Sequence, residues 1–134
     1  MSAQMVLVAE DDMMIQKLLK RMFKRAGFPG ECVIVSTGTD AVASLQAHRE
    51  EIVIALLDTG LAGYDDAGLF DALRAISPTL PIFASSGYSP EELKGHRHFD
   101  GRGLAGFLSK PFSMNDVRAL CEAQKLIPSS ETRT

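Results

Sequence analysis

Short apolar runs alternate with longer stretches of helical period, and this alternation occurs five times along the chain. Each short run is apolar at consecutive positions, so both faces of the strand that it predicts should be buried. Strands of this kind, separated by amphipathic helices, predict an α/β domain with a parallel sheet covered on both faces. The predicted strands are Met5–Ala9, Cys32–Val35, Ile52–Leu57, Pro81–Ser85 and Gly106–Leu108.

The stretch after the first strand gives the clearest helical pattern. Its apolar residues recur at i, i+3, i+4, i+7 and i+8 and form one face, comprising Ile15, Leu18, Leu19, Met22 and Phe23. The opposite face is basic and is expected to be solvated surface, with Lys17, Lys20, Arg21, Lys24 and Arg25. Asp12 is expected to cap the start of this helix, and Gly27 its end.

Four further helices follow from the same pattern. They start at Gly38 (running to about Glu50), near Asp66, at the Ser89-Pro90 pair and at Ser113. The inward residues are Ala41, Val42 and Leu45 in the first of these, Leu69, Phe70, Leu73 and Ile76 in the next, and Val117, Leu120 and Cys121 in the last. A single domain over residues 1–134 is expected, with a core over about 5–126 and a tail over 127–134.

Composition fits a globular domain, because 46% of the 134 residues are hydrophobic and 23% are charged. A net charge of -3 gives no electrostatic reason to expect nucleic-acid binding. No apolar run approaches the roughly 20 residues that span a bilayer, and no signal peptide is visible, so a cytoplasmic location without membrane contact is expected. Cys32 and Cys121 are interpreted as buried thiols rather than a disulfide or metal site.

Polar side chains follow the predicted strands at the points where they end. Glu10, Asp11 and Asp12 follow the first strand, Asp58 follows the third, and Ser86 follows the fourth. Lys110 follows the fifth. The carboxyl ends of parallel strands meet at one edge of a sheet, where functional groups gather. Clustered carboxylates repel one another, and a hard divalent cation such as Mg²⁺, or Mn²⁺ in its place, relieves that repulsion.

The chemistry of these groups suggests phosphoryl transfer. An Asp can act as the nucleophile and form an aspartyl phosphate, while Lys110 meets a phosphoryl oxygen and Ser86 donates a hydrogen bond to another. Each group also has an ordinary structural interpretation. A strand-end Asp is often a turn former, and a Lys before Pro is often solvated. The set taken together, in this order, is the specific observation.

Four segments carry a resemblance to a known family: Val6–Asp12, Ala55–Asp58, Pro81–Tyr88 and Gly106–Phe112. With them the chain resembles the receiver domain of bacterial two-component response regulators, from about Met5 to Leu126. The resemblance implies a doubly wound, flavodoxin-like (βα)5 fold with strand order 2-1-3-4-5. It also implies a signalling phosphoacceptor, which assists its own phosphorylation and dephosphorylation, rather than an enzyme in the ordinary sense.

The resemblance assigns a role to each site residue. Glu10, Asp11 and Asp58 would hold the cation together with the carbonyl oxygen of Gly60. Asp58 would accept the phosphoryl group from a histidine kinase or phosphotransfer protein. Lys110 and Ser86 would sense its arrival, and Phe107 occupies the position of the switch aromatic, although it could equally be a plain strand residue. The resemblance also makes Gly60 and Tyr88 the residues that tune the lifetime of the phosphorylated state.

Two segments depart from the family pattern. Where the family commonly has Met-Pro after the acceptor, and a Gly eight residues beyond it, this chain has Leu61-Ala62 and Asp66. The loop 59–66 is therefore expected to differ in shape, and the glycine-rich segment Lys94–Gly103 predicts a short or mobile fourth helix.

Alternatives remain open at this level. A receiver that is never phosphorylated could serve as an interaction scaffold. A flavin carrier lacks support, because no phosphate-binding loop follows the first strand. The output could be partner binding, a relay step or a phosphorylation-dependent homodimer. The Ser-Gly-Tyr-Ser at 86–89 resembles receivers of hybrid histidine kinases.

Overall fold

A five-stranded parallel sheet forms the centre of the molecule in the computed structural model, which describes residues 4–58, 61–64, 66–86, 105–109 and 113–127. Its strands are β1 (Met5–Ala9), β2 (Glu31–Val35), β3 (Ile52–Asp58), β4 (Ile82–Ser86) and β5 (Gly106–Ser109). Their order is β2-β1-β3-β4-β5, and every neighbouring pair is parallel. The predicted strand order is confirmed, and β1 pairs with β3 although β2 lies between them in sequence.

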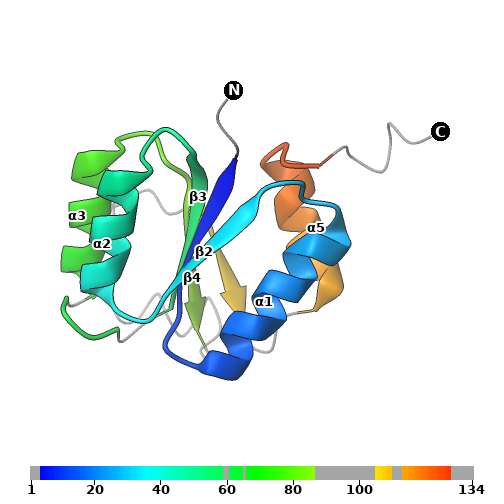
Figure 1. Cartoon of the computed structure of the whole chain (residues 1–134), viewed down its shortest axis with the longest axis horizontal. Helices are drawn as coiled ribbons and strands as arrows, with labels where there is room; N and C mark the ends of the chain where they lie inside the picture. Colours follow the sequence, from blue (N-terminus) through cyan, green and yellow to red (C-terminus); the bar gives the residue numbers. More distant parts are fainter. Residues whose placement is uncertain (1–3, 59–60, 65, 87–104, 110–112, 128–134) are drawn as a thin grey trace.

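Helices cover both faces of the sheet (Figure 1). On one face lie α1 (Met13–Ala26) and α5 (Met114–Ala123), and on the other lie α2 (Gly38–Ala47) and α3 (Asp66–Ile76). Right-handed crossovers between parallel strands require this two-sided arrangement. The predicted fourth helix and most of the predicted tail lie outside the described residues. No helix in the described part of the chain is long and apolar enough to cross a membrane.

Alternate residues of β1 point into two separate cores. Val6 and Val8 pack with α1 and α5, whereas Leu7 and Ala9 pack with α2 and α3. All four are at most 1% exposed. This two-sided burial explains why the strand is apolar at every position. Ile127 is also buried, so the core includes one residue of the predicted tail.

Helix α1 begins and ends at its predicted caps. The Asp12 carboxylate accepts hydrogen bonds from the N–H groups of Met14 and Ile15 at 2.8 and 3.2 Å. Gly27 has φ 97°, a left-handed conformation that favours glycine. Its N–H donates to the carbonyl oxygens of Phe23 and Lys24 in the last turn of the helix. The prediction that Leu18 points inward is wrong, because this side chain is 40% exposed.

The buried face of α1 agrees with the predicted one except at Leu18. Leu19, Met22 and Phe23 are buried as predicted, Ala26 joins them, and Ile15 is half-buried against the same core. The boundaries of α2 also differ slightly, since this helix ends at Ala47 rather than near Glu50. The inward residues predicted for α5 are all buried, as are three of the four predicted for α3, and Ile76 is half-buried against that core.

Candidate functional site

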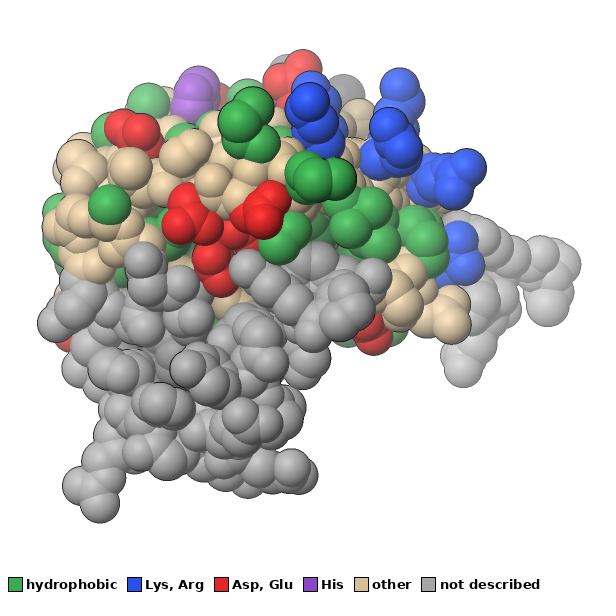
Figure 2. Space-filling view, turned by 90° about the horizontal axis from the view of Figure 1, so that it is seen from below, with side chains coloured by type: hydrophobic (Ala, Val, Ile, Leu, Met, Phe, Trp, Pro, Cys, Tyr) green, Lys and Arg blue, Asp and Glu red, His purple; other side chains and the backbone are tan. Residues whose placement is uncertain are grey.

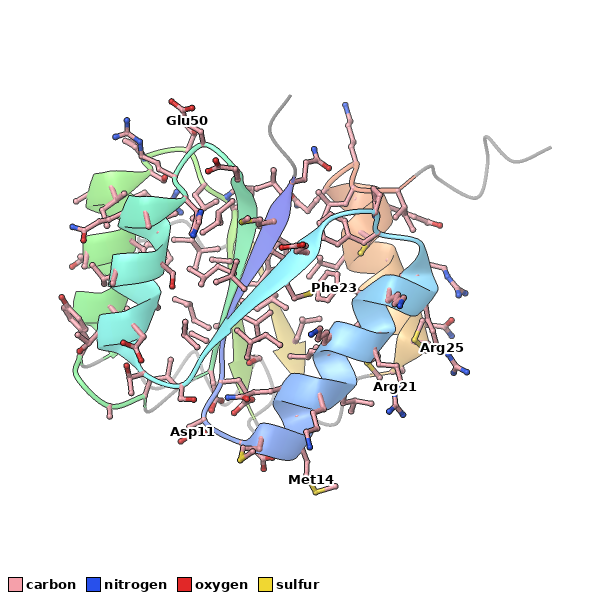
Figure 3. All side chains as sticks on the ribbon, in the orientation of Figure 1. Asp11, Met14, Arg21, Phe23, Arg25 and Glu50 are labelled. Atoms are coloured by element: carbon pink, nitrogen blue, oxygen red, sulfur yellow. The ribbon has the colours of Figure 1, made fainter. Side chains whose placement is uncertain are left out.

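Three carboxylates meet at the carboxyl edge of the sheet. Glu10, Asp11 and Asp58 each place one oxygen so that these atoms lie within 4.8 Å of one another. Figure 3 shows Asp11 at the end of the molecule toward which the strands point, and Figure 2 looks onto that end, where acidic side chains gather. Glu10 is 1% exposed, Asp58 is half-buried and Asp11 is exposed, so the cluster spans the boundary between core and solvent.

Backbone bonds from the neighbouring strand place Glu10. Its N–H donates to the carbonyl oxygen of Val35 at 2.9 Å, which extends the pairing of β1 with β2 by one residue. The N–H of Asp12 donates to Oε2 of Glu10 at 3.1 Å, which orients the buried carboxylate. A buried charge requires hydrogen bonds or a counter-charge of this kind.

The three consecutive acids after β1 have two different tasks. Asp12 caps α1, as its bonds to Met14 and Ile15 show. Asp11 lies between the cap and Glu10, and it belongs to the cluster. The predicted capping role of Asp12 is confirmed, and the role of Asp11 in the site stays a prediction.

Asp58 is the last residue of β3 and pairs in register with Ser85 of β4. Ser85 is buried, and Ser86 ends β4 in register with Ser109, the last residue of β5. The predicted site residues Gly60, Tyr88 and Lys110 lie outside the described residues. The side chains of Ser86 and Phe107 also lie outside them, although both backbones belong to strands.

The segment 61–64, where the family pattern breaks, is anchored to the start of α2. Leu61 is 4% exposed and packs into the core between the sheet and α3. The N–H of Gly38 donates to the carbonyl oxygen of Ala62 at 2.8 Å. Gly63 has φ 96°, and a Cβ there would overlap Oγ1 of Thr39. These anchors join segments far apart in sequence, and no local sequence signal predicts them.

The oxygen cluster suits a small divalent cation. Mg²⁺ prefers oxygen ligands at about 2.0–2.1 Å, which places ligand oxygens roughly 3 to 4 Å apart. A spread within 4.8 Å needs only small side-chain movements to reach that range. One buried and two accessible carboxylates also leave room for water and for a phosphoryl oxygen, which Mg²⁺ commonly keeps as ligands.

The chain is similar to known proteins of one family. The family model described as response regulator receiver domain matches residues 6–122. The C4-dicarboxylate transport transcriptional regulatory protein DctD of Rhizobium meliloti is 29% identical over 112 residues, which cover 84% of this chain and 23% of that protein. Transcriptional regulatory protein TctD of Salmonella typhimurium is 27% identical over 120 residues, covering 88% of this chain and 50% of that protein. The chain thus spans half or less of the length of these relatives.

A solved structure shows the same fold. The receiver domain of a sensor histidine kinase of Pseudomonas aeruginosa PAO1, crystallised with a magnesium ion in its active-site cleft, matches with a TM-score of 0.74. The match covers 92% of this chain and 98% of that one, at 24% sequence identity. At that identity, the likeness establishes the fold alone.

Proposed function

Because the chain belongs to the response regulator receiver domain family, we propose that Asp58 accepts a phosphoryl group from a histidine kinase or a phosphotransfer protein. The observation that carries this proposal is the cluster of Glu10, Asp11 and Asp58 at the carboxyl edge of the sheet. A sheet of this topology gathers its reactive groups at that edge. Asp58 is the accessible group there that also ends a central strand.

Glu10, Asp11 and Asp58 would hold Mg²⁺, with the carbonyl oxygen of Gly60 as a further ligand. Bound Mg²⁺ supplies positive charge that offsets the negative charge of the phosphoryl oxygens. The Pseudomonas receiver domain has a magnesium ion coordinated in its own active-site cleft, which supports the assignment. Mn²⁺ has the same ligand preference and serves as a probe of the site.

In the transfer step a carboxylate oxygen of Asp58 attacks phosphorus opposite the donor histidine. The P–N bond breaks, its electron pair stays on the imidazole nitrogen, and a P–O bond forms to Asp58. Asp58 is half-buried, so its carboxylate is partly exposed to an approaching donor. The protein assists a transfer onto itself and then loses the group by hydrolysis.

Ser86 and Lys110 are proposed to bind the transferred group. Ser86 ends the strand beside β3, and Lys110 directly follows Ser109, which pairs with Ser86. Ser86 thus ends its strand at the same edge as Asp58, and Lys110, the next residue after β5 in the sequence, is expected to reach that edge. The hydroxyl of Ser86 and the ammonium of Lys110 would each bind an oxygen of the phosphoryl group on Asp58. The movement of these two side chains toward the phosphoryl group would let Phe107 pack inward as the switch.

The intact mass of the chain after incubation with a phosphoryl donor distinguishes a phosphoacceptor from a scaffold that is never phosphorylated. Incubation with acetyl phosphate and Mg²⁺ should add the mass of one phosphoryl group to the intact chain. Asp58→Asn should gain no mass under the same conditions, while Asp40→Asn, a matched change on α2, should gain it normally. A wild-type chain that stays unmodified by both acetyl phosphate and a phosphohistidine donor would favour the scaffold.

We propose that Gly60 and Tyr88 influence how long Asp58 stays phosphorylated. A bulky side chain at position 88 would shield the aspartyl phosphate from attacking water, whereas Gly60 has no side chain that could do so. Tyr88→Ala should therefore speed the loss of phosphate, followed by intact mass against time. An unchanged rate would contradict the shielding role. Tyr64→Ala, which alters the other tyrosine of the chain, is the control.

The output of the whole protein belongs to the same proposal. The curated relatives are transcriptional regulators and the Pseudomonas receiver is part of a sensor kinase, so either context suits this domain. We propose that phosphorylation switches partner binding, including a phosphorylation-dependent homodimer as one form. A cytoplasmic location stays a prediction from the sequence.

A further inference from the structure

One side chain of α1 reaches back to the strand end that carries the acidic cluster. The amide nitrogen Nε2 of Gln16 donates to the carbonyl oxygen of Glu10 at 2.6 Å. The same nitrogen donates to Oγ of Ser36 at 3.2 Å, using its second hydrogen. Gln16 is half-buried, and it joins α1 to the residues that follow both β1 and β2.

The bond to Glu10 acts on the peptide group between two of the clustered carboxylates. A peptide group is planar, so holding the carbonyl oxygen of Glu10 also holds the nitrogen and Cα of Asp11. On the other side of Glu10, its own N–H is fixed by the carbonyl of Val35 at 2.9 Å. The Asp11 side chain is exposed, so its direction depends on the backbone that carries it.

Two further hydrogen bonds at the start of α1 hold the segment from Glu10 to Gln16. The N–H of Gln16 donates to the carbonyl oxygen of Asp12 at 3.0 Å, which is the first backbone bond of the helix. The N–H of Asp12 donates in turn to Oε2 of Glu10 at 3.1 Å. The backbone from 10 to 16 is therefore fixed at both ends. The side-chain amide of Gln16 joins these two ends through its bond to the carbonyl oxygen of Glu10.

We infer that Gln16 is a positioning residue for the cation site, which it serves by fixing the peptide plane between Glu10 and Asp11. This inference rests on the proposed function, since it assumes that these carboxylates bind a divalent cation. The side-chain amide of Gln16 bonds the backbone carbonyl of Glu10 and the hydroxyl of Ser36, so it is proposed to act on the site through the backbone. Loss of such a supporting bond typically weakens metal binding by about tenfold or more.

The test measures Mn²⁺ binding to the full chain, from the electron paramagnetic resonance signal of free Mn²⁺ during titration. Gln16→Met keeps the length of the side chain and removes the donor, so its dissociation constant should rise about tenfold. Gln46→Met makes the same chemical change at an exposed position of α2 and should leave the constant unchanged. Circular dichroism of the metal-free chains confirms that each variant is folded.

A second variant covers the case in which Gln16→Met does not fold. Gln16→Asn keeps the amide but is one methylene shorter, so it should also bind Mn²⁺ more weakly. If folded Gln16→Met, or in its place Gln16→Asn, binds Mn²⁺ with wild-type affinity, Gln16 is only a structural link and the inference is overturned. If the wild-type chain binds no Mn²⁺, the proposed cation site fails and the inference fails with it.

Discussion

At the scale of single residues, chemically similar side chains have different tasks because the backbone places them differently. Asp11 and Asp12 are neighbours in sequence, yet Asp11 joins the acidic cluster and Asp12 caps a helix. Both tasks could be predicted, since each depends on a local position at a strand end or helix start. The supporting role of Gln16 could not be predicted, because it depends on where α1 lies against the sheet.

The two cysteines are a case where burial decides chemistry. Burial raises the pKa of the Cys32 thiol from 9.0 to about 11, a rise that Lys20 partly opposes. Burial likewise raises the pKa of Cys121 to about 11, with smaller contributions from Cys32 and Glu122. Both thiols are free, in agreement with the interpretation from the sequence, although Cys32 is only half-buried.

These pKa values predict a loss of stability in alkali. In the unfolded chain both thiols ionise near pH 9, whereas in the folded chain they keep their protons until about pH 11. Above pH 9 the unfolded state therefore binds fewer protons, and the free energy of unfolding falls as the pH rises from 9 to 11. Urea unfolding across that range should show a shallower fall for Cys32→Ala/Cys121→Ala. An identical slope in both proteins would show that the thiols do not contribute.

At the scale of elements, the connection after β3 shows how a departure from the family pattern is accommodated. Leu61 is buried in the core, and Gly38 of α2 bonds the carbonyl of Ala62. Gly63 takes a left-handed conformation against Thr39. The sequence predicted that this loop would differ in shape but not where it would be anchored, because the anchors lie on α2.

Gly63→Ala should lower the free energy of unfolding by about 2 kcal/mol or more. The left-handed φ of 96° costs an L residue roughly 1–2 kcal/mol, and the new Cβ would also overlap Thr39. Gly27→Ala is the matched control: its φ is 97°, but its Cβ would meet only a side-chain carbon at 3.9 Å. Urea unfolding should find Gly63→Ala the more costly change, and Thr39→Ala should recover part of the loss. Equal costs at positions 27 and 63 would refute the overlap.

At the scale of the whole molecule, the pattern of strands and helices predicted a parallel sheet covered on both faces, and the family resemblance supplied its strand order. Continuous apolar strands require two covered faces, and only a few topologies satisfy that requirement. Boundaries and the face of α1 were less predictable, since Leu18 is as apolar as Leu19 and only packing against α5 and the sheet distinguishes them. The meeting of the carboxylates at one edge of the sheet could be predicted from the fold. The distances between their oxygens could be obtained only from the structure.

Binding of a cation should stabilise the whole domain. A ligand that binds only the folded state at 100 times its dissociation constant adds about 2.7 kcal/mol to the free energy of unfolding. We expect this gain from Mg²⁺ in urea unfolding followed by circular dichroism, since the chain has no Trp for fluorescence. Asp11→Asn should show little of the gain, while Asp71→Asn, on the exposed side of α3, should show all of it. Equal stabilisation of Asp11→Asn would place the cation elsewhere.

The pairing of β1 with β3 has a consequence for assembly of the domain. A chain that has emerged only as far as β2 contains Glu10 and Asp11 but lacks Asp58, so its cation site is incomplete. The site forms only after the chain has made a contact between strands that are not consecutive in sequence. During refolding, Mn²⁺ would then bind only after β1 has paired with β3. The rate of Mn²⁺ binding would therefore report when these two strands pair.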